Sequence, residues 1–261
     1  MMDILVVLIP LLFGLIVGSF INVVILRLPQ DKGIVWDRSA CRSCSTQLSW
    51  YENIPLVSYI LLRGKCRTCK ASISIQYPLI ELIHGIVSAY LFYNWPSFTI
   101  ETLIYQFCFF VITSILISHF IIDLRHQLLL DKLNIALLIP TMVLIHIDQR
   151  YMDAIIGGTF GFLVPLIVTW IFYKLSGKIG LGGGDIKLFG VIGLLFGTRG
   201  VLLNLFTSCM LGSLVTIALI GLKIVKRDQY IPFGPYIILV AGAQLFFPDI
   251  IVSWSHFLFP Y

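Results

Sequence analysis

The chain has few charged residues. Only 12% of its 261 residues are Asp, Glu, Lys or Arg, and 58% are hydrophobic. A soluble domain carries roughly 25% charged residues, so this composition excludes an ordinary soluble protein and predicts one that lies in a lipid bilayer. The net charge of +5 is then explained by orientation in the membrane, and no nucleic-acid partner is predicted.

Two familiar signals are also absent. No G-x-G-x-x-G follows a predicted strand, so nothing indicates a Rossmann-type nucleotide site. The first apolar run has no basic leader and no small-residue cleavage site, and its basic residue, Arg27, comes after it. We therefore interpret this run as a retained membrane span, not as a cleaved signal.

Long apolar runs recur along the whole chain. A full helical span needs ~20 residues, although ~17 are tolerated. The candidate runs are 4–26, 79–95, 102–122, 134–147, 154–173, 186–197, 200–222 and 235–248. Two of them, 134–147 and 186–197, are short enough to be tilted, re-entrant or covered by neighbouring helices. We expect an all-α polytopic membrane protein with about eight transmembrane helices.

The positions of the basic residues predict the orientation, because Lys and Arg accumulate in cytoplasmic segments. With eight crossings and the amino terminus outside, only Arg150 and Arg199 among the 18 Lys and Arg residues fall on the outer face. Removing the 186–197 crossing would move Lys223 and its basic neighbours outward, so this crossing is retained.

One polar segment, residues 29–78, interrupts the apolar runs. It contains two C-x-x-C sequences separated by 21 residues, formed by Cys41, Cys44, Cys66 and Cys69. Such knuckles supply the four thiolates of a tetrahedral structural zinc site, with a redox pair or reduced thiols as the alternative. We predict a small cytoplasmic zinc-ribbon-like domain between the first two helices, where disulfides are less expected. Cys108 and Cys209 lie in apolar runs and are expected to be buried.

A carboxylate follows a run of glycines inside apolar surroundings, in the sequence Gly180-Leu181-Gly182-Gly183-Gly184-Asp185-Ile186-Lys187. Glycines let the backbone unwind and approach a ligand, and an ionisable group near membrane depth is tolerated mainly where function holds it. We interpret Asp185 as half of a catalytic pair. The surrounding catalytic loop would comprise Gly182, Gly183, Gly184 and Lys187. A solvated polar loop between two helices is the alternative.

The partner of Asp185 must lie on the same membrane face. Asp123 ends the run 102–122 at the inner interface, and we favour it over Asp131, which a helix N-cap would explain. Two neighbouring carboxyls share a proton, so that one activates water while the other protonates the developing oxyanion. This is aspartic peptidase chemistry. His119 lies one turn before Asp123, but a lone His in an apolar helix is usually a core residue.

Further segments carry a resemblance to a known family. They are GSFINVVILRLP at 18–29, ENIP at 52–55, RGKCR at 63–67, YPLIEL at 77–82 and IPFGPY at 231–236. Together with the glycine–Asp185 segment, they make the chain resemble the bacterial type IV prepilin peptidases along nearly its full length. One departure is Leu130, where the family usually has Pro before its second Asp. This change loosens a turn and touches neither proposed catalytic carboxylate.

The resemblance implies an activity. The family cleaves the short basic leader of prepilins and pseudopilins after a Gly, on the cytoplasmic side of the bacterial inner membrane. It then methylates the new terminal residue, commonly Phe, with S-adenosylmethionine. Asp123 and Asp185 map to its aspartyl dyad, and Glu52, Lys65 and Glu81 are candidates for methyl transfer. The implied domains are helix 1 at 1–28, the zinc domain at 29–78 and the helical bundle at 79–261.

Two other classes of function compete with the peptidase. An ion-coupled transporter also uses intramembrane carboxylates and glycine-broken helices. However, both Asps belong to the cytoplasmic edge and no matching broken segments occur in two halves of the chain. A membrane-tethered zinc module that only binds partners would explain residues 29–78 but leaves Asp185 without a purpose.

Overall fold

The computed structural model describes residues 2–34, 38–95, 97, 99–178, 180–226 and 231–248. Residues 35–37 of the predicted zinc domain and 249–261 of the predicted bundle lie outside these ranges. The chain divides into two compact units, Met1–Phe110 and Val111–Tyr261, and the boundary falls within helix α4 (Ile100–His126). The described secondary structure is helical apart from two isolated bridges in the polar segment, as the sequence predicts.

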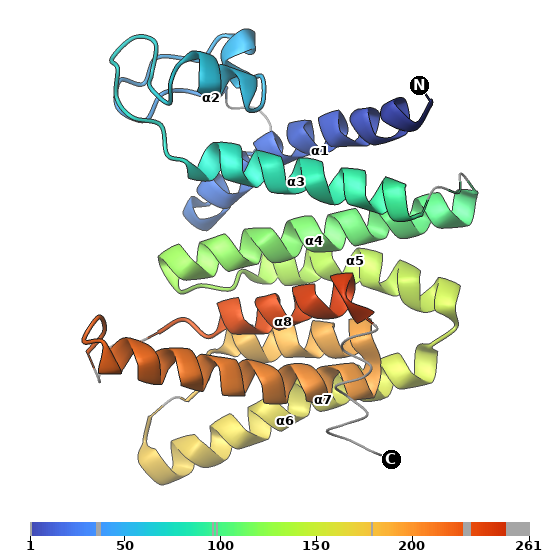
Figure 1. Cartoon of the computed structure of the whole chain (residues 1–261). Helices are drawn as coiled ribbons and strands as arrows, with labels where there is room; N and C mark the ends of the chain where they lie inside the picture. Colours follow the sequence, from blue (N-terminus) through green and yellow to red (C-terminus); the bar gives the residue numbers. More distant parts are fainter. Residues whose placement is uncertain are drawn as a thin grey trace. The chain divides into compact units, whose positions relative to one another are not determined.

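In the first unit, helices α1 (Met2–Arg27) and α3 (Gln76–Asn94) lie side by side (Figure 1). Their backbones meet at glycines. A Cβ atom at Gly18 would lie 2.7 Å from the Cα of Glu81, and one at Gly85 would lie 2.9 Å from Leu15. Small residues of this kind allow membrane helices to approach closely, because packing rather than water drives their association.

The polar segment between α1 and α3 contains η1 (Leu28–Gln30), η2 (Trp50–Asn53) and α2 (Val57–Leu61). Its two cysteine knuckles have the same backbone geometry. In each, the residue directly after the second cysteine has a positive φ, 57° at Ser45 and 59° at Lys70. An isolated bridge flanks each knuckle, Ala40 with Gln47 in the first and Lys65 with Ser72 in the second. The repeated turn brings both cysteine pairs to one place.

In the second unit, the end of α4 is followed by α5 (Asp131–Asp148), α6 (Tyr151–Ser176), α7 (Gly183–Gly221) and α8 (Gly234–Phe246). Helices α6 and α7 make the most extensive contact of the second unit, again through glycine (Figure 1). A Cβ atom at Gly158 would lie 2.7 Å from the Leu194 side chain, and Gly157 meets the backbone of Gly193. Helix α7 is thereby fixed against α6 at backbone distance.

Helix α7 reverses direction at Gly197, whose φ of 72° and ψ of −171° are not helical. The Asp153 carboxylate accepts a hydrogen bond of 3.0 Å from the Thr198 N–H, so it caps the second segment. A Cβ atom at Gly161 would meet both Phe189 and Val201, which would stand ~18 Å apart in a straight helix. The predicted separation of the runs 186–197 and 200–222 is therefore confirmed.

Four described helices are long and apolar enough to cross a membrane by length and composition. They are Val7–Gln30, Ile100–His126, Tyr151–Ser176 and Gly183–Gly221. The protein is therefore a helical membrane protein, while the expected number of eight crossings is not established by this criterion. The prediction of burial is correct for Cys108 and wrong for Cys209, which is exposed. The face of α7 that carries Cys209 borders a hollow beside the start of α8.

Candidate functional site

Asp123 lies near the end of α4 and is 4% exposed. Its carboxyl group lies directly against the first residue of α8, Gly234. A Cβ atom at that position would be 2.5 Å from Asp123 Oδ2, and the Gly234 backbone N–H interacts with the carboxylate. Oδ2 itself has no hydrogen-bond partner among the described residues. A glycine at 234 is therefore needed for Asp123 to occupy this place.

Asp185 lies in the first turn of α7 and is 6% exposed. Its side chain folds back over the N-cap residue, because a Cβ atom at Gly182 would lie 2.9 Å from Asp185 Oδ2. The carboxylate interacts with the Gly182 N–H, and the positive end of the helix dipole favours a negative charge there. Gly183 and Gly184, expected in a loop, are the first two residues of α7, and Gly182 is its N-cap.

The two carboxyl groups lie in the same unit and are close enough to interact electrostatically. The loop between α4 and α5 packs beside both. A Cβ atom at Gly184 would be 2.8 Å from Leu129 Cβ, and one at Gly234 would be 3.2 Å from Leu129 Cδ1. Leu129 therefore contacts Gly184, which precedes Asp185, and Gly234, which faces Asp123. Two buried carboxyls that interact in this way do not both ionise readily, because their negative charges repel each other.

Asp131 has a different environment from the one expected. It is the first residue of α5, whose N-cap is Leu130, so the predicted N-cap role is wrong. Both Asp131 carboxylate oxygens accept hydrogen bonds from Lys187 Nζ, at 2.8 and 2.7 Å, and the two side chains are more than half exposed. Lys187 thus joins the start of α7 to the start of α5, away from the buried pair.

Two buried polar side chains near Asp123 were not predicted to belong to the site. His119, one turn earlier in α4, is 0% exposed, and Asn134 of α5 is 5% exposed. The two side chains lie next to each other, yet none of their polar atoms makes a hydrogen bond of standard geometry with the described residues. Only their polarity within apolar runs could have indicated them.

The cysteine cluster lies in the first unit. The Sγ atoms of Cys41, Cys44, Cys66 and Cys69 all lie within 4.8 Å of one another, an arrangement that could hold a metal ion. Hydrogen bonds with the side chain and backbone of Thr46 lower the pKa of the Cys44 thiol to about 6. Backbone groups of Cys69 and Thr68 lower the pKa of the Cys66 thiol. The thiolate, which is the metal-binding form, is therefore favoured at Cys44 and Cys66. A backbone hydrogen bond with Ala71 acts in the same direction on Cys69, but burial and the neighbouring thiols outweigh it and raise the pKa of Cys69 to about 11.

The sequence of the chain matches two family models. Residues 12–95 match the bacterial peptidase A24 N-terminal domain, and residues 108–217 match the type IV leader peptidase family. The prepilin leader peptidase/N-methyltransferase of Pseudomonas aeruginosa is 33% identical to the chain, with 93% of this chain and 91% of that protein covered. The chain belongs to the type IV leader peptidase family.

Other members of the leader peptidase family are similarly close. The prepilin leader peptidase/N-methyltransferases of Aeromonas hydrophila and Xanthomonas campestris pv. campestris are 34% and 36% identical. The first alignment covers 93% of this chain and 91% of the relative, and the second covers 90% and 88%. No solved structure matches the chain with comparable significance. Membership of a leader peptidase family identifies a protease and speaks against the transporter and the zinc module that only binds partners.

The three residues considered for methyl transfer in this leader peptidase lie in the first unit. The Glu52 carboxylate accepts a hydrogen bond of 2.8 Å from the Ser49 N–H and lies 3.5 Å from Arg67, completing a capping box. The Glu81 carboxylate accepts a 2.8 Å hydrogen bond from the Leu56 N–H. Lys65 is exposed. The two glutamates therefore have structural partners, whereas Lys65 presents its side chain to the surroundings.

Proposed function

We propose that the protein is an aspartic endopeptidase that removes the leader of type IV prepilins or pseudopilins and then N-methylates the new amino terminus. The observation that carries the peptidase activity is the buried pair Asp123 and Asp185, held by Gly234 and Gly182. The names of the relatives, which cover most of the chain, support both activities.

The carboxyl pair would work as one acid and one base. The ionised carboxylate takes a proton from water while the water oxygen bonds to the scissile carbonyl carbon, and the protonated carboxyl gives its proton to the carbonyl oxygen. The tetrahedral intermediate then collapses, the C–N bond breaks, and the departing amine receives a proton from the pair. The unpartnered Asp123 Oδ2 is an atom that can contact the water or the carbonyl.

We propose that the dyad faces the cytoplasm in a bundle of about eight crossings in the bacterial inner membrane, with the amino terminus outside. Two features of the second unit support this orientation. Arg150 donates a 3.1 Å hydrogen bond to the Leu195 carbonyl, and Arg199 follows the break at Gly197. Asp185 begins the first segment of α7, so the two arginines predicted on the outer face lie at the opposite end of that segment. Lys187 lies at the dyad end.

We propose zinc as the ion of the cysteine cluster, with all four cysteines as ligands. Tetrahedral zinc with Zn–S bonds of about 2.3 Å places its sulfurs roughly 3.8 Å apart. The separation of Cys41 Sγ and Cys69 Sγ is 3.8 Å, and all four Sγ atoms lie within 4.8 Å of one another. The donor set therefore fits the ion, whose bonds would hold the two knuckles together and stabilise residues 29–78.

Methyl transfer is proposed to occur in the first unit, with Lys65, Glu52 and Glu81 as candidates. S-adenosylmethionine supplies the methyl group as an electrophilic carbon, and the peptide amine must be neutral and aligned with it. The exposed Lys65 is the candidate best placed to contact a ligand, because Glu52 and Glu81 already accept hydrogen bonds from the backbone. These glutamates would instead hold the surface on which the ligand binds.

The peptidase is tested with full-length protein in detergent and a peptide that carries a basic leader and a Gly–Phe bond. Asp123→Asn and Asp185→Asn should each abolish cleavage, because losing either acid or base removes the concerted route. Asp131→Asn should cleave far faster than either variant, because the exposed Asp131 carboxylate pairs with Lys187 and is not part of the buried pair. Normal cleavage by Asp123→Asn together with loss in Asp131→Asn would show that the dyad is wrongly assigned. An intact peptide with ion flux in liposomes would favour a transporter.

A further inference from the structure

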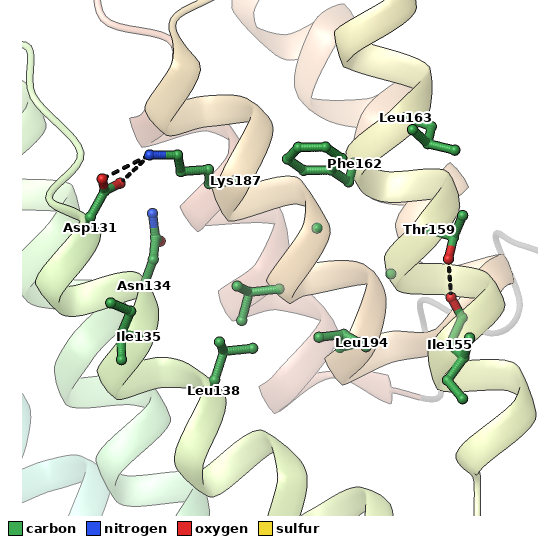
Figure 2. A pocket seen from close by; sticks show the side chains of 13 residues that line it. Asp131, Asn134, Ile135, Leu138, Ile155, Thr159, Phe162, Leu163, Lys187 and Leu194 are labelled. Atoms are coloured by element: carbon green, nitrogen blue, oxygen red, sulfur yellow. Dashed lines mark hydrogen bonds and ion pairs between the residues drawn. The ribbon is translucent and has the colours of Figure 1, made fainter.

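Three helices of the second unit enclose an apolar groove of about 670 Å³. Figure 2 shows its construction: α7 forms the floor, α5 stands on one side and α6 on the other. Each helix contributes side chains at spacings of three and four residues, over 131–138, 155–163 and 187–194. One face of each helix therefore lines the groove, which extends over about two helical turns, or ~10 Å.

The groove begins within one turn of Asp185 along α7, on a different face of the helix, and becomes apolar with distance from that end. Its polar end is the ion pair of Asp131 with Lys187, which lies two residues after Asp185 (Figure 2). Leu138 and Leu194 line its far end. The proposed substrate has the same change of polarity, because a charged leader precedes the scissile bond and an apolar helix follows it. The groove is thus complementary in polarity to the proposed substrate, and Asn134, which lines it, lies next to His119, one turn before Asp123.

Asn134 gives the groove one unusual polar group. Its side chain lines the groove one turn from Asp131 and is 5% exposed, yet both its amide atoms lack a hydrogen-bond partner among the described residues. A buried amide without partners is unfavourable unless a ligand supplies them. A helix that is cut must unwind around the scissile bond, which leaves backbone N–H and C=O groups without partners in a region that excludes water.

We infer that this groove binds the apolar helix that follows the scissile bond of the substrate, and that Asn134 hydrogen-bonds the backbone of its unwound first turn. The inference rests on the proposed peptidase function and assigns it a substrate-binding surface on α5, α6 and α7. Lipid chains would occupy the groove before the substrate enters laterally from the bilayer.

Filling the groove tests the inference, and two neighbouring isoleucines provide a matched pair. Ile155 lines the groove and is 58% exposed, whereas Ile156 is 43% exposed and lies outside the lining. With the full chain in liposomes, Ile155→Trp should lower kcat/KM about tenfold for a peptide that carries the apolar helix. The loss should be much smaller for a peptide ending shortly after the bond. Equal effects of Ile155→Trp and Ile156→Trp, or equal losses with both peptides, would overturn the inference.

Asn134→Leu separates a ligand-binding role from a structural one. Because the substitution removes a buried amide without partners, the midpoint of thermal unfolding should stay the same or rise. Cleavage of both peptides should nevertheless fall about tenfold. Unchanged cleavage, or a joint loss of stability and cleavage, would contradict the role assigned to Asn134.

Binding can also be read without turnover. Asp185→Asn protein is mixed with a long peptide that carries a photoreactive phenylalanine in its apolar part, and the labelled residues are identified by mass spectrometry. Label should appear at Ile135 and Leu138 more strongly than at Ile139, which is exposed on the same helix outside the groove. If the wild type cleaves the peptide but the label appears outside the groove, the assignment of the groove is refuted and the peptidase function is not. If the label appears in the groove but the wild type cleaves no peptide, the groove binds the helix and the peptidase function is refuted.

Discussion

Replacing Gly234 with alanine tests whether the position of Asp123 in the structure is its working position. The substitution adds one methyl group at the first residue of α8, opposite the Asp123 carboxylate. That methyl carbon would lie 2.5 Å from Oδ2, 3.1 Å from Cγ and 3.2 Å from Leu129 Cδ1. No change of charge or of any hydrogen-bonding group accompanies it, so the perturbation is steric.

The size of the effect follows from these distances. Ordinary contact with a Cβ atom begins at 3.4 Å, so the carboxyl group must move by roughly 1 Å. Asp123 is 4% exposed, and Leu129 blocks part of the space around it. A misplacement of about 1 Å can lower the rate about 100-fold, and overpacking a buried site costs about 1–3 kcal/mol of unfolding free energy. We expect kcat for the leader peptide to fall about 100-fold with a modest loss of thermal stability.

Gly242→Ala is the matched control, because it lies in the same helix and a Cβ atom there would meet nothing within 4 Å. Alanine is the better helix former by about 1 kcal/mol, so this variant should be as stable as the wild type or more stable, with normal cleavage. Single-turnover cleavage and thermal unfolding are measured for both variants. A wild-type kcat in Gly234→Ala would show that Asp123 does not work from its position against α8.

Three further outcomes are expected. Purified protein should contain about one zinc ion per chain, and Cys41→Ser should lose the ion and destabilise residues 29–78. Metal analysis that finds no zinc in wild-type protein prepared under reducing conditions would contradict the zinc site. With a labelled methyl donor and a pre-cleaved peptide that has a free terminal Phe, Asp185→Asn should still methylate the peptide and Lys65→Met should not. Loss of methylation in both variants would indicate that one site carries out both reactions. Gly197→Ala should lower the unfolding free energy by about 1–3 kcal/mol, because the position has φ of 72° and faces the Asp153 carboxylate, and an unchanged unfolding midpoint would contradict the reversal.

Much of the architecture could be predicted because it depends on local pattern. Apolar length placed most helices within a few residues, and Gly197 with its neighbours separated two apolar runs that belong to reversed segments. The paired C-x-x-C spacing predicted the cysteine cluster, since tight turns fix where neighbouring thiols point. The roles of Asp123 and Asp185 as acid and base remain predictions.

Contacts between distant segments could not be predicted in this way. An Asp such as Asp131 is common at the start of a helix. Its position in the sequence therefore did not predict the ion pair with Lys187. The contact of Gly234 with Asp123 and the unpartnered amide of Asn134 depend on how α5 and α8 pack against other helices. Periodicity identifies the buried face of a helix but not the residue opposite each position.

The contact between Asp123 and Gly234 also bears on when activity arises during synthesis. Helices α6 and α7 are consecutive and pack through glycine, so they can associate as soon as the second one enters the bilayer. Asp123 and Asp185 are by then both present, but the backbone that fixes Asp123 comes from the last described helix. A nascent chain still emerging from the ribosome therefore carries both acids without their final support. On the proposed assignment of Asp123 and Asp185 as the dyad, we expect proteolytic activity only after α8 has been added.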